Sequence, residues 1–255
     1  FSLFTKGFNE EDLRALKENI QTLQRFKGLP TFSWMDSMVS KLEDKLTIKS
    51  SVGNIIDYED NAYYSGIDWL KDCFDAIIGQ QPLKIDYRNF NDKEFNWTIH
   101  PYYIKQYNSR WFLLGKNPDY INLAVIPLDR IDNIEPVHIP YVINTEYDFE
   151  TIFDDVIGVT LTKASAMNIK LRFSQKRLQY ILTKPIHKSQ VCNDQKTGIV
   201  SLKVVINREL EALLLSFGPD VEVLEPESLR KQIQTKVKKS FDNYFSVQAG
   251  CTTSP

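Results

Sequence analysis

Residues 100–115 of the chain read HPYYIKQYNSRWFLLG, and this stretch decides the fold of the middle of the protein. Asn108-Ser109 within it favours a two-residue hairpin turn, and the flanking residues are rich in aromatic and aliphatic side chains that favour strands. Pairing outward from this turn gives three cross-strand pairs: Tyr107–Arg110, Lys105–Phe112 and Tyr103–Leu114. The sequence therefore predicts a β-hairpin with two chemically different faces.

One predicted face of the hairpin is apolar and is expected to lie in the core; it carries Ile104, Trp111 and Leu113. The other face is an aromatic and basic strip; it carries Tyr103, Lys105, Tyr107, Arg110 and Phe112. Aromatic rings stack on bases while Lys and Arg contact phosphates, a combination that nucleic-acid-binding sheets use. The same residue types are also common on any exposed strand face, and the pattern alone favours that plainer interpretation.

Three more residues join the candidate ligand contacts. Arg88 ends the first predicted strand, and Arg130 lies in LDRID, residues 128–132, the densest charged cluster of a strand region. Asp129 and Arg130 could hold a ligand there or could pair with each other. His100 falls on the Trp111 face in the predicted register, a position more typical of a buried core histidine than of a ligand contact.

The hairpin belongs to a longer series of short strands. Alternation of apolar and polar residues begins at residue 83, where LKIDYRNF reads as a half-buried strand. Further strands are expected at residues 95–107, 110–114, 121–128 and 131–137, and Asn, Asp and Pro supply the turns between them. Five short strands in so little chain predict a small, highly curved antiparallel sheet or barrel.

The flanking parts of the chain have different patterns. Apolar residues recur at helical spacing in residues 10–26, 34–46 and 67–78, so the N-terminal part is expected to be a helical linker. Residues 168–224 predict the order β-α-β-β-α-β of a ferredoxin-like sandwich, with Asn207 capping the second helix, and Pro226 begins one extra helix. One predicted strand of this series covers residues 186–192.

The expected fold is therefore α+β, in three parts. We assign residues 1–80 to the linker and dimerisation region, residues 81–142 to the barrel and residues 165–245 to the ferredoxin-like part.

Composition limits the possible functions. The chain has 255 residues and a formal net charge of −2, so anion binding must come from a local patch. Its three scattered cysteines argue for a reducing compartment, and no apolar run approaches a membrane span, which together predict a cytoplasmic protein. The sequence has no metal-binding histidine pair, phosphate loop or nucleophile elbow. We therefore predict no enzyme, no catalytic residue, no metal and no cofactor.

Three stretches carry a family resemblance: GIDWLKDCFDAIIGQQPLKIDYRNF at residues 66–90, IHPYYIKQYNSRWFLLG at 99–115 and IPLDRI at 126–131. They resemble the WYL-domain family of bacterial transcriptional regulators, and Trp111-Phe112-Leu113 occupies the motif that names the family, with Phe in place of Tyr. The stretch SFGPDVEVLEPESLR, at residues 216–230, resembles the extension that often follows this domain.

The resemblance implies an Sm-like barrel that senses a single-stranded nucleic acid or nucleotide-like effector. It also implies a homodimer, and a winged helix-turn-helix upstream of Phe1 that binds DNA. In the expected site, Lys105 and Arg110 contact phosphate, Tyr103 and Phe112 stack, and Arg130 closes the anion site. Two departures weaken anion binding: many family members carry a basic residue where this chain has Pro127, and an Arg where it has Trp97.

A second hypothesis is a purely structural dimerisation or interaction module that binds no small ligand. The last predicted helix supports it in part, because an apolar stripe runs along it beside several lysines: Leu229, Ile233, Val237 and Phe241.

Overall fold

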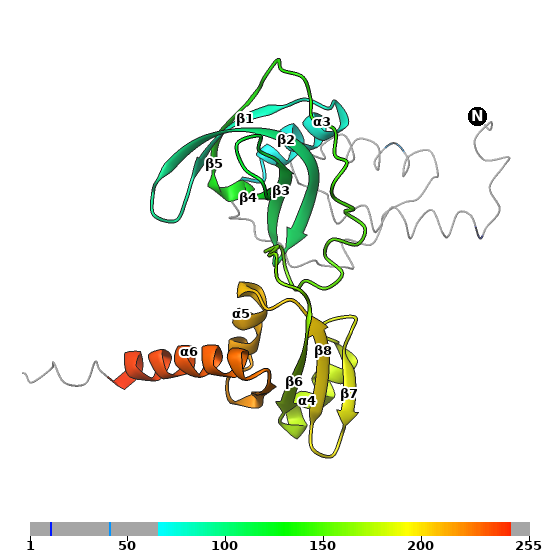
Figure 1. The fold of residues 1–255 in the computed structure, drawn as a ribbon, viewed down its shortest axis with the longest axis vertical. Coiled ribbons are helices and arrows are strands. Elements are labelled where there is room, and N and C mark those ends of the chain that lie inside the picture. The colour runs from blue at the N-terminus through cyan, green and yellow to red at the C-terminus, as the bar shows by residue number, and fades with distance from the viewer. Residues whose placement is uncertain (1–10, 12–40, 42–65, 246–255) are drawn as a thin grey trace, which may run out of the picture. The chain divides into compact units, whose positions relative to one another are not determined.

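The computed structural model describes residues 11, 41 and 66–245 of the chain (Figure 1). The first two predicted helices, at residues 10–26 and 34–46, lie almost entirely outside the described residues. The chain divides into two compact units, residues 1–145 and 146–255.

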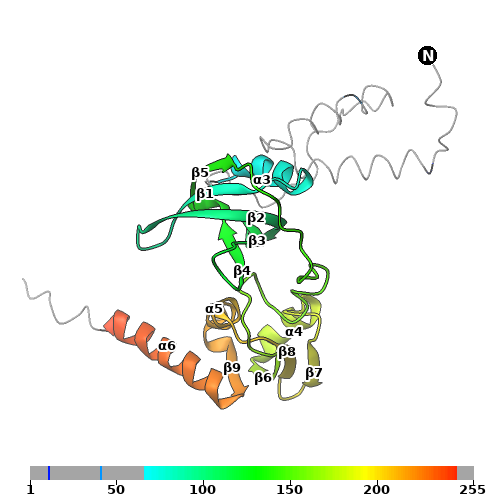
Figure 2. The same cartoon turned by 45° about the horizontal axis from the view of Figure 1, so that its top comes forward.

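The described part of the first unit is one helix and a five-stranded antiparallel sheet (Figure 2). The helix is α3 (Trp69–Ile78), and the strands are β1 (Leu83–Arg88), β2 (Glu94–Tyr107), β3 (Arg110–Lys116), β4 (Leu123–Pro127) and β5 (Ile131–Pro136). The strand order is β4-β3-β2-β1-β5, and the single turn η3 (Leu128–Arg130) connects the two edge strands. β2 bends strongly along its length (Figure 1). The curved antiparallel sheet is thus observed, while its closure into a barrel stays a prediction.

The core of the first unit lies between α3 and the sheet. Leu70, Cys73 and Ala76 of α3 pack in the same buried cluster as Ile85 of β1 and Leu113 of β3. Each fully buried aliphatic side chain contributes about 1.5–3 kcal/mol relative to exposure. This helix, which the sequence assigns to the linker, therefore shares its core with the strands.

The described part of the second unit contains a four-stranded antiparallel sheet and three α-helices, preceded by an irregular segment. Its elements are β6 (Met167–Phe173), α4 (Gln175–Thr183), β7 (Val191–Asp194), β8 (Ile199–Val204), α5 (Arg208–Ser216), β9 (Val221–Glu225) and α6 (Glu227–Phe245). The strand order is β7-β8-β6-β9, so β8 lies between β6 and β7, as the split β-α-β motif requires. The β-α-β-β-α-β order with one extra helix is the order that the sequence predicts.

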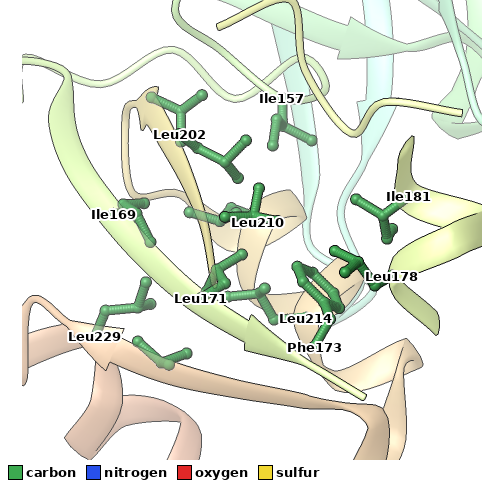
Figure 3. Close-up of a cluster of buried hydrophobic side chains, with 13 residues drawn as sticks. Ile157, Ile169, Leu171, Phe173, Leu178, Ile181, Leu202, Leu210, Leu214 and Leu229 are labelled. Atoms are coloured by element: carbon green, nitrogen blue, oxygen red, sulfur yellow. The ribbon is translucent and has the colours of Figure 1, made fainter. Parts of the chain in front are cut away.

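A second buried cluster lies between this sheet and its helices (Figure 3). Leu171 and Phe173 of β6 point into it together with Leu178 of α4 and Leu210 of α5. Both units therefore combine helices with antiparallel sheets, which confirms the α+β class.

One strand of the second unit is shorter than predicted. The sequence predicts a strand at residues 186–192, but β7 begins only at Val191. Gln190 accepts a hydrogen bond from the Ile186 amide and donates one to the Ile181 carbonyl, and the Ser189 amide donates to His187. Such local bonds from side chains to the backbone compete with sheet pairing.

Asn207 fixes the irregular segment that precedes β6. Its Oδ1 accepts a hydrogen bond from the Leu210 amide, which confirms the predicted N-cap of α5. Its Nδ2 donates to the carbonyl oxygens of Ile157, at 2.9 Å, and of Thr160, at 3.2 Å. One buried side chain thereby satisfies a helix end and two carbonyls of a distant segment.

Candidate ligand-binding site

The hairpin that joins β2 to β3 has the register predicted from the sequence. The turn residues Asn108 and Ser109 have φ angles of 52° and 58°, the positive values that a tight two-residue turn of type I′ needs. The paired residues include Tyr107–Arg110, Lys105–Phe112 and Tyr103–Leu114. This register separates the side chains of the hairpin into the two predicted faces.

The apolar face of the hairpin is the core face, as predicted. Leu113 is fully buried, and Ile104 and Trp111 pack against the cluster that contains it.

The aromatic and basic strip is only partly open. Tyr103 is 37% exposed, while Lys105 and Arg110 are half-buried. Phe112 is only 9% exposed, so its ring offers little surface for stacking on a ligand. Burial also lowers the pKa of the Lys105 amine below its usual value.

Arg110 forms an ion pair with Asp129 of η3. Its Nη2 donates to Asp129 Oδ2 at 2.5 Å, and the side chains are 35% and 17% exposed. The alternative that Asp129 pairs with Arg130 is therefore not the observed one. Adjacent residues of a helical turn point in different directions, so neither side chain faces the other.

The charges of Arg110, Asp129 and Arg130 influence the pKa of Tyr87 on β1. Burial raises the pKa of Tyr87, and the two arginines oppose this effect while Asp129 adds to it. All three charges therefore act on the Tyr87 hydroxyl. The guanidinium carbon of Arg130 lies 3.6 Å from the ring centroid of Phe90, a cation–π contact.

An aromatic cluster that the sequence analysis did not identify lies beside these charges. Tyr87 stacks on Trp97 with a centroid separation of 4.8 Å, Phe95 lies 5.3 Å from Trp97, and Tyr120 meets Trp97 edge-on at 6.3 Å. In the β1–β2 ladder Tyr87 is opposite Phe95 and Ile85 is opposite Trp97. Alternation along the two strands could have revealed most of this cluster, because Tyr87, Phe95 and Trp97 share the face of the buried Ile85.

Arg88 lies apart from this constellation. It is exposed and forms ion pairs with Glu94, at 3.5 Å, and Asp132, at 3.1 Å. Because Arg88 follows Tyr87 in the strand, it points to the opposite face of the sheet. The structure thus does not bring Arg88 together with Arg110 and Arg130.

His100 is buried, with 1% of its surface exposed, and burial lowers its pKa. A register shift between Pro101 and Tyr103 places His100 opposite Lys116, so it leaves the core face to which the sequence assigns it. Its Nδ1 accepts a hydrogen bond of 3.1 Å from the Val142 amide. This geometry gives His100 a packing role within the first unit.

Further bonds hold residues 137–142 against the same part of β2. The Tyr141 hydroxyl donates to the Pro101 carbonyl at 2.5 Å, and the Tyr102 hydroxyl donates to the Val142 carbonyl at 3.0 Å. This segment leads from β5 toward the second unit. It is therefore fixed to the strand that carries Tyr103 and Lys105.

Within residues 66–245, no three His, Cys, Asp or Glu side chains come close enough to form a metal site. No described helix is both long and apolar enough to span a bilayer. The guanidinium groups of Arg110 and Arg130 are suited to binding an anion, and the aromatic rings are suited to stacking on a planar molecule.

Two solved structures are similar to the chain at low identity. One is the proteasome accessory factor B/C (PafBC) of Arthrobacter aurescens, with 16% identity and a TM-score of 0.30, covering 93% of this chain and 37% of that one. The other is described as a CRISPR Cas-related protein, with 11% identity and a TM-score of 0.48, covering 70% of this chain and 52% of that one. The chain thus spans about a third to a half of these proteins. No curated protein matches it.

Two sequence-family models match consecutive parts of the chain. The WYL domain matches residues 68–136, which include α3 and all five strands of the first sheet. The WCX domain matches residues 165–240, which include the second sheet and most of α6. Together they cover more than half of the chain, in the order that the resemblance implies. The chain therefore belongs to the WYL-domain family, with a WCX domain after its WYL domain.

Proposed function

We propose that this chain is the ligand-sensing and oligomerisation portion of a DNA-binding transcriptional regulator. Its effector is a single-stranded nucleic acid or a nucleotide-like molecule. The observation that carries the proposal is the half-buried Arg110, which pairs with Asp129 and shares its hairpin face with Lys105 and the exposed Tyr103. DNA binding itself belongs to a winged helix-turn-helix outside this sequence, and no catalytic step is assigned to the chain.

Each residue of the proposed site has a distinct role. Arg110 uses one nitrogen for Asp129, and the remaining N–H groups of its guanidinium can bind phosphate. Lys105 lies on the same face of the hairpin, two positions along the ladder, and adds a second cation. Stacking falls to the exposed Tyr103 rather than to the buried Phe112. Arg130, next to Asp129 in η3, supplies further positive charge.

Binding of a fluorescein-labelled single-stranded oligonucleotide, followed by fluorescence anisotropy at several salt concentrations, tests this assignment. Arg110→Ala and Lys105→Ala should each weaken binding about tenfold, since a lost charge-assisted hydrogen bond is worth about 1.5–3 kcal/mol. Each should also lower the slope of log K against log salt by about 0.7. Lys196→Ala, an exposed lysine in the turn between β7 and β8, is the matched control. Unchanged affinity and slope in both site variants would refute the proposal.

A second candidate function, a dimerisation module without a ligand, is favoured by the far end of α6. The predicted apolar stripe divides there: Leu229 is buried in the core of the second unit, whereas Val237 and Phe241 are 51% and 57% exposed. Phe245 is 63% exposed and stacks on Phe241 with centroids 4.2 Å apart. Such an exposed apolar surface is typical of an interface between proteins.

Sedimentation equilibrium of the wild type and of Phe241→Ser tests this second function. If α6 pairs with α6 of a second copy, the variant should shift from dimer to monomer. Tyr180→Ser removes an aromatic ring of similar exposure, 46%, from α4 and serves as the control. A variant that stays dimeric, or a wild type that is monomeric at high concentration, would contradict dimerisation through α6.

A further inference from the structure

We propose that Asp129 is a built-in counter-ion of the effector site, which competes with a phosphate-bearing ligand for Arg110 and so limits its affinity. This inference rests on the proposed function, because it concerns how the same site discriminates among ligands. It assigns to Asp129 an effect opposite in sign to that of Arg110, Lys105 and Arg130.

The accessibility of the two partners supports this role. Asp129 is 17% exposed and Arg110 is 35% exposed, so solvent reaches the guanidinium more easily than the carboxylate. A ligand that approaches from solvent therefore meets Arg110 first. Asp129 already occupies one of the Arg110 nitrogens at 2.5 Å. A phosphate that binds both terminal nitrogens of Arg110 must displace this contact.

The ion pair is also incomplete. Only Oδ2 of Asp129 bonds to Arg110, whereas Oδ1 is buried and has no hydrogen-bond partner among the described residues. Arginine and a carboxylate pair best through two parallel bonds. A buried acceptor without a partner is also unfavourable. When a phosphate oxygen replaces Asp129 at Arg110, the ion pair that is lost is therefore weaker than an ideal pair with two parallel bonds.

The local charges set the direction of the effect. Arg110, Arg130 and Asp129 all act on Tyr87, and this group of three residues carries two positive charges and one negative charge. Removal of the Asp129 charge raises the net charge of this group from +1 to +2. The attraction of an anion grows accordingly, and more strongly in this half-buried setting than in open water.

Asp129 could alternatively hold Arg110 in the orientation that phosphate needs. Loss of Asp129 would then weaken binding. The position of Arg110 has a second support, however, because its guanidinium also lies 5.9 Å from the centroid of the buried Phe112 ring. We therefore expect Arg110 to keep its place when Asp129 is neutralised.

The counter-ion also predicts the class of ligand. A monoanion such as a carboxylate or chloride gains little by replacing a carboxylate that is already in place. A terminal phosphate carries up to two charges at neutral pH and several acceptor oxygens, so it competes better. The site should therefore favour a nucleotide or oligonucleotide with a terminal phosphate over the same molecule without it.

The experiment measures two labelled oligonucleotides of one sequence, with and without a 5′-phosphate, on the full chain. Asp129→Asn should bind the phosphorylated probe at least about threefold more tightly than wild type does, and its salt slope should be steeper by about 0.7. Asp72→Asn removes the same charge from the exposed face of α3 and should change neither quantity. If Asp129→Asn does not fold, Asp129→Ser, which is also neutral, should show the same sign.

The double variant Arg110→Ala/Asp129→Asn separates the two proposals. Its affinity for the phosphorylated probe should fall to that of Arg110→Ala, because the tighter binding of Asp129→Asn depends on Arg110. If Arg110→Ala weakens binding but neutral Asp129 variants bind equally or less tightly, the counter-ion role is wrong and the proposed site stands. If neither wild type nor Asp129→Asn binds either probe, both proposals fail.

Discussion

Trp97 stacks on Tyr87, with ring centroids 4.8 Å apart and ring planes 16° from parallel. Trp97 is one of the two positions at which the sequence departs from the basic residues expected of the family; the other is Pro127. The structure shows what replaces the charge at this position. The ring of Trp97 forms a cluster with Phe95 and Tyr120.

Trp97→Ala should lower the free energy of unfolding of the first unit by about 2 kcal/mol. Removal of a fully buried Trp costs about 3–5 kcal/mol, and half-buried Trp97 should cost less. Urea unfolding, monitored through hydrogen exchange of the amides in β1 and β2, measures the loss of stability in this unit alone. Trp97→Phe keeps a ring against Tyr87 and should lose less than half as much free energy of unfolding as Trp97→Ala. Equal midpoints for Trp97→Ala and wild type would show that the stack does not contribute to stability.

The register of the hairpin could be predicted because local chemistry sets it. Asn108 and Ser109 tolerate the positive φ angles of a tight turn, and every pair next to the turn follows from that choice. The α+β class and the cap at Asn207 could be predicted for the same reason, since alternation and capping are read from neighbouring residues.

Features that depend on distant contacts could not be predicted. The register shift near Pro101 reverses the side to which His100 points, and the partners there are Tyr141 and Val142, forty or more residues away. The contact between Arg110 and Asp129 likewise joins the hairpin to the turn that connects the edge strands. Sequence spacing carries no signal for either contact.

Stability of the first unit should fall as the pH drops below about 6.5 because of His100. Burial lowers its pKa in the folded protein below the ordinary value of 6.5. The unfolded chain therefore binds more protons in the acidic range, so the contribution of His100 is complete above pH 6.5 and is lost as the pH falls. Protonation of Nδ1 would also remove the acceptor of the Val142 amide.

Urea midpoints at pH 7.5, 6.0 and 5.0 measure this dependence. His100→Asn keeps an acceptor near Nδ1 but does not titrate, so its stability should fall less between pH 7.5 and 5.0 than that of wild type. His187 in the second unit also has a pKa lowered mainly by burial, and it remains in both proteins. Parallel pH profiles for wild type and His100→Asn would contradict the assignment.

Asn207→Ala should destabilise the second unit by about 2–3 kcal/mol. The change removes the N-cap of α5, worth about 1 kcal/mol, and leaves the carbonyls of Ile157 and Thr160 without their donor. Asn207→Ser keeps a capping oxygen but cannot reach both carbonyls, so its stability should lie between that of Asn207→Ala and that of wild type. Thermal or urea unfolding checks the order, and a Ser variant as unstable as Ala would show that the cap contributes little.

Cys73 should resist thiol reagents in the folded protein, whereas Cys192 should react. Cys73 is fully buried between α3 and the sheet, and desolvation raises the pKa of its thiol to about 12, so almost no thiolate forms at pH 8. Cys192 on β7 is only half-buried. Iodoacetamide at pH 8, followed by mass spectrometry of the peptides, should find Cys192 modified early. Cys73 should be modified only in urea; its rapid modification without denaturant would mean that α3 leaves the sheet far more often than this core allows.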